Sequence, residues 1–424
     1  MTCKHCGAEL NGNASVCPVC GKPIHNTKKV RNKAITIVSV VLLVAALAGA
    51  VGLAIYLNAR RPEPQKTYTA SNEDVIAAGD QVVATIGEYQ LNVRQLQIYY
   101  WMEVYSFMDE YSSDLTYMGF DYNKPFEEQI CFMDETKSWQ EFFLDCALES
   151  WHQMVAVVME AKKANYVLDS VTQEYLDDLR ETMEKTAKDA KYDSANDMLA
   201  AELGAGVDLD TYVQYITFVQ TGSSYYQTVV DGFQPEMDAI EKYFTDNEAY
   251  FKKYNITKES GNVVGVRHIL IVPEGGTKDS DGDVTYSEEE WEACRKAAQA
   301  MLDGYLAGGK IDEEAFANLA KEHSKDPGSA SNGGLYAAFP KGYMVKPFEE
   351  WSFAEGRQYG DTGLVKTSHG YHIMFFVQSQ PEWQYYSRSG VINQMAADLL
   401  DEWQNGVTIQ TDYEKIVLSQ VKFS

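Results

Sequence analysis

Two histidines stand three residues apart in KTSHGYHIMFF, where a polar turn enters an apolar run. The chain has only seven histidines, and another, His268, lies in the apolar segment VVGVRHILIV. On neighbouring strands, two imidazoles can share a hydrogen bond, fix each other's tautomers and so orient a site electrostatically. His268 and His372 are therefore candidates for an active face. The alternative is a pair of core histidines satisfied by hydrogen bonding. His369 receives no role.

The cysteines and serines of the chain do not indicate a hydrolase with a nucleophilic side chain. Cys294 lies in a predicted helix without a motif around it, and the chain has no GxSxG sequence. Cys131 and Cys146 are the other two cysteines beyond the N-terminal segment. With Cys294 they number three, so they cannot all be paired in disulfides within the chain. We expect these three to be buried thiols, with a Cys131–Cys146 disulfide as the alternative.

Four further cysteines form two CxxC pairs separated by ten residues: Cys3, Cys6, Cys17 and Cys20. Four thiolates at this spacing close a tetrahedral zinc site, and so short a segment has no core of its own to fold around. The sequence predicts a zinc ribbon over residues 1–25, with structural zinc. Two disulfides or a redox-active CxxC pair are the alternatives.

A stretch of 24 residues without a charge, Ala34–Leu57, follows the cysteines. At about 1.5 Å per residue a helix of this length spans roughly 36 Å, enough to cross a bilayer with some tilt. Lys28, Lys29, Arg31 and Lys33 precede it, whereas only Arg60 and Arg61 follow closely. This bias places the N-terminus in the cytoplasm and the bulk of the chain outside the cell membrane.

The charge of the chain is strongly asymmetric. The total is −26, but 28 of the 36 bases and 61 of the 62 acids lie beyond residue 61, a net charge of −33 for that part. A body so acidic is a poor partner for nucleic acid. No nucleic-acid ligand is therefore expected.

Two kinds of structure must position the histidines. After a polar linker (58–80), residues 81–260 show mostly helical periodicity, with apolar residues at intervals of three and four. Residues 261–380 then read as strand (Val263–Val272), helices (Glu288–Ala307 and Glu313–His323), loop, short helix (Lys346–Phe353) and a final strand at GYHIMFFVQ. This order predicts an α+β domain with helices over a small sheet. The end, 381–424, reads as a helix over Ser387–Asn405 and a second near Tyr413–Gln420.

The block Val266–Val377 resembles the parvulin (PpiC-type rotamase) family of peptidyl-prolyl isomerases. Four motifs carry the resemblance in the family's order: VRHILI, FANLAKEHSKDPGSASNGG, FPKGYMVKPFEEWSF and GLVKTSHGYHIMFF. The helical flanks also resemble membrane-anchored foldases of the PrsA and SurA type. The family implies a four-stranded sheet wrapped by helices, with the site on its concave face.

The resemblance also assigns roles to individual residues. It implies that His268, Asp326, Thr367 and His372 are the polar groups of the site. Phe339, Met344 and Phe348 match the apolar residues that hold the substrate proline. Where the family commonly has Gly-Asp-Leu-Gly, this chain reads NGGLYAAF, which brings Tyr336 to the rim of the pocket.

The expected function is therefore peptidyl-prolyl isomerisation and chaperoning of exported polypeptides that contain X–Pro bonds, without a cofactor for the reaction. The helical residues 81–260 would form an all-α, chaperone-like domain, with residues 381–424 packing on it and homodimerisation as one further possibility. A non-catalytic holdase that uses the parvulin block as a scaffold is the alternative. A sensor that couples the ribbon to an external binding event is a third interpretation.

Overall fold

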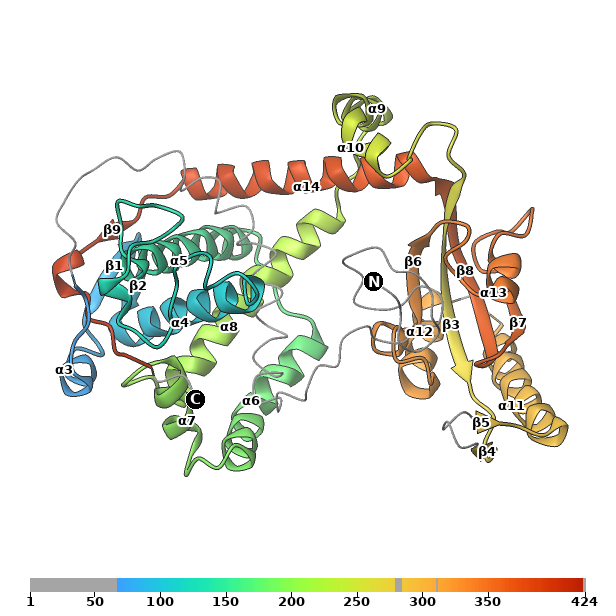
Figure 1. Ribbon diagram of the computed structural model, residues 1–424, viewed down its shortest axis with the longest axis horizontal. Coiled ribbons are helices and arrows are strands. Elements are labelled where there is room, and N and C mark those ends of the chain that lie inside the picture. The colour runs from blue at the N-terminus through green and yellow to red at the C-terminus, as the bar shows by residue number, and fades with distance from the viewer. Residues whose placement is uncertain (1–66, 279–283, 310–311, 422–424) are drawn as a thin grey trace. The chain divides into compact units, whose positions relative to one another are not determined.

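The protein is described by a computed structural model that covers residues 67–278, 284–309 and 312–421 (Figure 1). The expected zinc ribbon (1–25) and membrane segment (34–57) lie outside the described residues. In the part of the chain that the structure describes, no helix is both long and apolar enough to cross a membrane.

The described chain divides into two compact units. One, which we call the helical unit, contains residues 67–232 and 397–421. The other, the sheet unit, contains residues 233–396. This division differs from the expected boundary near residue 260, because two short helices, α9 (Met237–Asp246) and α10 (Glu248–Lys253), pack with Trp383 and Val391 of α14 (Glu382–Asn405).

The helical unit surrounds one large core of aliphatic and aromatic side chains. Its long helices begin at side-chain caps, such as the reciprocal Ser138–Glu141 box at the start of α5. Its elements are α3 (Asn72–Ala77), β1 (Val82–Ile86), β2 (Tyr89–Asn92), α4 (Val93–Glu110), η1 (Phe126–Glu128), α5 (Trp139–Lys163), α6 (Ser170–Asp189), α7 (Ala195–Leu203), α8 (Leu209–Asp231), β9 (Gln410–Thr411) and η3 (Tyr413–Lys415).

The expectation of an all-α domain was wrong in one respect. The β1–β2 hairpin pairs with β9 in a three-stranded sheet of order β2-β1-β9. The helix expected near Tyr413–Gln420 was also wrong, because the backbone of Leu418 instead exchanges hydrogen bonds of 2.8 and 3.0 Å with Tyr68 and Ala70. Leu418 pairs with residues near the other end of the described chain, and such a long-range contact produces no periodic pattern in the local sequence.

The sheet unit contains an antiparallel four-stranded sheet of order β6-β3-β8-β7 (Figure 1). Besides α9, α10 and the first part of α14, its elements are β3 (Asn262–Ile271), β4 (Thr277–Lys278), β5 (Val284–Thr285), α11 (Glu288–Ala307), α12 (Glu313–His323), η2 (Ala330–Asn332), β6 (Leu335–Phe339), α13 (Lys346–Ser352), β7 (Thr362–Thr367) and β8 (Gly370–Pro381).

The two faces of this sheet carry different partners because side chains alternate along each strand. Ile269 of β3 and Phe375 of β8 point to the face covered by α11 and α12. Val266 and Met374 point to the opposite face, which α13 covers through Phe348. By the same alternation, His268 and His372 belong to the α13 face.

The cysteines of the described residues are all free thiols. Cys131 and Cys294 are buried, and Cys146 is partly buried. No disulfide therefore links Cys131 to Cys146 in this structure.

Candidate functional site

The two strands at the centre of the sheet bring His268 and His372 into contact. His268 of β3 lies opposite Met374, and His372 of β8 lies opposite Leu270, so the two rings are diagonal neighbours on one face. Their Nδ1 atoms are 3.0 Å apart, and the side chains are 2% and 5% exposed. A hydrogen bond in such a dry environment fixes both rings.

The loop after α12 carries Asp326 to the other side of His268. Ser324 fastens this loop to β3, since its hydroxyl accepts the N–H of Leu270, and Lys325 donates its own N–H to the Leu270 carbonyl. The Asp326 Oδ2 atom then lies 3.2 Å from His268 Nε2. The contacts of Ser324 and Lys325 with the backbone of Leu270 therefore fix the position of the Asp326 carboxylate.

The hydrogen-bond chain defines the tautomers when both rings are neutral. An ionised Asp326 accepts the His268 Nε2–H, so His268 Nδ1 must accept from His372 Nδ1–H. His372 Nε2 is left as an acceptor, and the Thr367 hydroxyl lies 2.8 Å from it. Thr367 in turn accepts the backbone N–H of His369, whose side chain is exposed.

The pKa directions agree with this pattern. Burial, with the neighbouring His268, lowers the pKa of His372 to about 3, so its imidazole is neutral at physiological pH. Burial acts to raise the pKa of Asp326, but hydrogen bonds from His268, Ser329 and Tyr336 outweigh it and hold the pKa well below its ordinary value. The site thus joins one ionised carboxylate, Asp326, to a histidine pair in which His372 is neutral.

Aromatic side chains line the apolar side of the pair. The Phe348 ring stands edge-on to both imidazoles at 5.3 Å. Phe339 lies 6.1 Å beyond it, and Met344 packs on the same cluster. Phe339 and Phe348 are 2% and 3% exposed, so they form the floor, whereas Met344 is half-buried at the rim.

Two residues extend the site beyond those with assigned roles. The fully buried Ser329 hydroxyl donates to Asp326 at 2.5 Å and lies 3.0 Å from His268 Nε2. Tyr336 donates its hydroxyl to Asp326 at 3.1 Å, and its ring stacks on His268 at 5.4 Å. Ser329 lies within the SKDPGS motif, but a serine in a polar loop gives no signal of burial.

A close approach of two backbones shapes the turn before β6. Gly334 has a φ of +74°, and a Cβ there would lie 2.1 Å from the His268 carbonyl oxygen. His268 donates its N–H to the Gly334 carbonyl at 2.8 Å. Glycine is required because both the conformation and the space exclude a side chain.

The predicted polar residues, His268, Asp326, Thr367 and His372, thus form one hydrogen-bonded chain beside the predicted apolar residues Phe339, Met344 and Phe348. Among the residues described by the structure, no group of three or more His, Cys, Asp or Glu side chains is arranged to hold a metal ion. The four N-terminal cysteines fall outside that part.

Comparison with known proteins agrees with the geometry of this region. Residues 250–379 match the family model of the PPIC-type PPIase domain. Foldase protein PrsA 1 of Listeria innocua is 26% identical over 181 residues, 41% of this chain and 62% of that protein. The chain thus spans less than two thirds of that relative. The PrsA foldase of Caldanaerobacter subterraneus is 24% identical over 72% of this chain and 76% of that protein.

Among solved structures, PrsA from Bacillus subtilis is similar at 16% identity, covering 63% of this chain and 88% of that one with a TM-score of 0.28. The family match is confined to the sheet unit, where the histidine pair lies. This chain is therefore a mixed α+β protein with a PPIC-type parvulin domain over residues 250–379 and homology to the PrsA foldases.

Proposed function

We propose that this protein is a membrane-anchored, extracytoplasmic peptidyl-prolyl cis-trans isomerase and chaperone that assists the folding of exported proteins. One observation carries the proposal: a buried chain of Thr367, His372, His268 and Asp326 stands beside an apolar floor within a PPIC-type domain.

The reaction requires no proton transfer and no nucleophile. Rotation about an X–Pro bond is slow because amide resonance must be broken, at a barrier of about 18–20 kcal/mol for an ordinary peptide bond. The twisted amide is less polar than the planar one. A surface that holds the proline ring away from water therefore favours the transition state.

The residues of the site divide this work. Met344 and Phe348 hold the proline ring, because sulfur and aromatic faces pack well on an apolar ring. The neutral imidazole of His372 supports that surface without the desolvation cost of a buried cation. Asp326 supplies a fixed negative charge at the edge of the pocket, held by Ser329 and Tyr336.

Client binding outside the sheet unit is proposed for the segment between α4 and α5. Five of its apolar side chains, Tyr117, Tyr122, Ile130, Phe132 and Met133, are 39–80% exposed, and the Tyr117 and Phe132 rings lie 5.6 Å apart. We call these residues the apolar patch. Acidic residues such as Asp121, Glu127 and Asp134 accompany it in the same segment. Such a surface suits unfolded chains with apolar and basic residues.

The anchor and the ribbon complete the proposal and rest on sequence. Ala34–Leu57 would span the cell membrane with the N-terminus in the cytoplasm. Cys3, Cys6, Cys17 and Cys20 would hold one structural zinc ion there. Homodimerisation is part of the same proposal, and analytical ultracentrifugation of the full-length chain tests it.

Two assays on the purified full-length chain separate this proposal from the non-catalytic holdase. One follows isomerisation of a short X–Pro peptide, and the other follows suppression of aggregation of an unfolded client. Activity in both supports the proposal. Suppression of aggregation by a folded chain that does not accelerate isomerisation would replace it with the holdase.

A further inference from the structure

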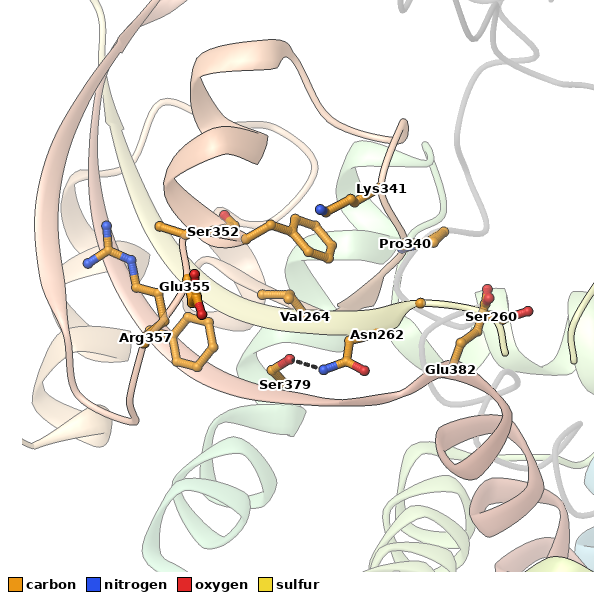
Figure 2. A pocket seen from close by; sticks show the side chains of 15 residues that line it. Ser260, Asn262, Val264, Pro340, Lys341, Ser352, Glu355, Arg357, Ser379 and Glu382 are labelled. Atoms are coloured by element: carbon orange, nitrogen blue, oxygen red, sulfur yellow. Dashed lines mark hydrogen bonds between the residues drawn. The ribbon is translucent and has the colours of Figure 1, made fainter. Parts of the chain in front are cut away.

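A pocket of about 630 Å³ opens in the sheet unit (Figure 2). The beginning of β3, the turn after β6, the segment after α13 and the end of β8 enclose it. Its apolar lining includes Val264, Phe353 and Phe376. Lys341 and Glu355 also line it, and none of the polar site residues does.

The pocket lies on the same face of the sheet as the histidines. Val264 and Phe376 belong to the cluster that contains Phe348 and Phe339. Val264 precedes His268 by four residues on β3, which corresponds to about 13 Å at 3.3 Å per residue. A row of aromatic rings joins the two places, since Phe353 lies 5.7 Å from Phe339 and Phe339 lies 6.1 Å from Phe348.

The strand order leaves room for an extended chain along this path. β6 ends at Phe339, opposite Val264, and the next two residues, Pro340 and Lys341, line the pocket. Asn262 and Val263 of β3 pair with β8, and their register includes no residue of β6. The pocket thus continues the line of β6 along β3.

The wall of the pocket that is formed by the segment after α13 is fixed by contacts of Arg357. The Arg357 guanidinium lies 3.9 Å over the Trp351 ring and donates to the Trp351 carbonyl at 2.8 Å. Asn262 donates to Ser379 at 2.9 Å on the strand side (Figure 2). A preformed pocket loses little entropy when it is filled.

We propose that this pocket is a second subsite for the client polypeptide, which receives an apolar side chain four to five residues away from the isomerised proline. The inference rests on the proposed function, because it extends the same substrate along the same face. The apolar lining of Val264, Phe353 and Phe376 selects the side chain, while continuity with the proline floor sets the spacing.

The test uses the full-length chain and two kinds of peptide. One is a four-residue X–Pro peptide, and the others carry a leucine five residues before or after the proline. Ala354→Trp fills the pocket from an exposed position that lines it. Ala300→Trp is the matched control, because Ala300 is exposed on α11, which covers the opposite face.

We expect one of the longer peptides to show a kcat/KM about tenfold above that of the short peptide, as burial of one leucine side chain permits. Ala354→Trp removes that advantage and leaves short-peptide turnover within about twofold of wild type, whereas Ala300→Trp changes neither. Glu355→Trp, at the next exposed lining position, replaces Ala354→Trp if that variant does not fold.

Two results overturn the subsite. Equal kcat/KM for long and short peptides in the wild type does so while leaving the isomerase proposal intact. If neither peptide is isomerised, the isomerase proposal fails. The dissociation constant of a fluorescent long peptide then tests whether the pocket binds the client. Equal dissociation constants for wild type and Ala354→Trp would then refute it.

Discussion

At the scale of single residues, Asp326 is the most constrained group of the site. Its Oδ2 atom receives Ser329, Tyr336 and His268, so one oxygen is held from three directions. Hydrogen bonds to an ionised carboxylate are roughly twice as strong as neutral ones. These three hydrogen bonds therefore hold the negative charge of Asp326 in one position, although it lies in a loop.

Tyr336 contributes both a hydroxyl and a stacked ring to this arrangement. Tyr336→Phe keeps the ring on His268 but removes the hydrogen bond to Asp326, and we expect a loss of about two- to tenfold in kcat/KM. Tyr336→Leu removes both and should cost more. Isomerisation assays, with near-UV circular dichroism to verify folding, measure this. Unchanged kcat/KM in both variants would show that Tyr336 only covers the pocket.

The depressed pKa of His372 has a consequence for stability. The unfolded chain protonates this histidine near its ordinary pKa of 6.5, whereas the folded chain does so near 3. The unfolded state therefore binds more protons between these values, and stability is lost as pH falls through that window. The contribution is on the order of 5 kcal/mol when the full shift is converted at about 1.36 kcal/mol per pKa unit.

Urea unfolding of the wild type and His372→Gln at several pH values tests this. The wild type should lose stability between pH 6.5 and 3 more steeply than the variant. The difference between the two is the informative quantity, because the acidic residues of the whole chain titrate in both. Parallel curves for the two proteins would mean that the pKa of His372 is the same in the folded and unfolded states.

At the scale of elements, the apolar patch between α4 and α5 allows the proposed client binding to be tested separately from isomerisation. We expect Tyr117→Ser with Phe132→Ser to weaken suppression of client aggregation severalfold and to leave short-peptide isomerisation unchanged, because both side chains are exposed. Val171→Ser is the control, since Val171 is 75% exposed on α6 of the same unit. Equal losses in the double variant and the control would argue against a specific patch.

Elements with strong local signals were predictable from sequence. The boundaries of α11 and α12 agree with the prediction, because Ser287 and Asp312 cap them and apolar residues recur on one face. The buried strand β3 was also predicted to within a residue. β6 and β7 gave no separate signal, because LYAAF and TGLVKT are short and only partly buried.

The site itself was predictable only where motifs carry it. His268, Asp326, Thr367 and His372 follow from the resemblance, but their hydrogen-bond order depends on the register of β3 and β8. Ser329 and the Tyr336–Asp326 contact depend on how a loop folds back onto the sheet. The pocket beside Val264 likewise joins four segments that are distant in sequence.

At the scale of the whole molecule, the proposal separates a cytoplasmic ribbon from an extracytoplasmic folding unit. Metal analysis of the full-length protein should give one zinc per chain, and Cys3→Ser with Cys6→Ser should abolish it, because two of four ligands are lost. Cys146→Ser is the control and should retain zinc. Isomerisation should be equal in all three proteins. Zinc retained in the double variant would refute the ribbon.

The most direct test of the central claim is the kcat/KM for a short X–Pro peptide, measured side by side for the full-length wild type and Met344→Ala. Met344 is half-buried at the rim of the floor, so its truncation removes proline contact and leaves the buried histidine pair in place. The account predicts clear acceleration by the wild type and a loss of about tenfold in the variant. Isomerisation at the uncatalysed rate by a folded wild type, or equal rates for both proteins, would contradict it.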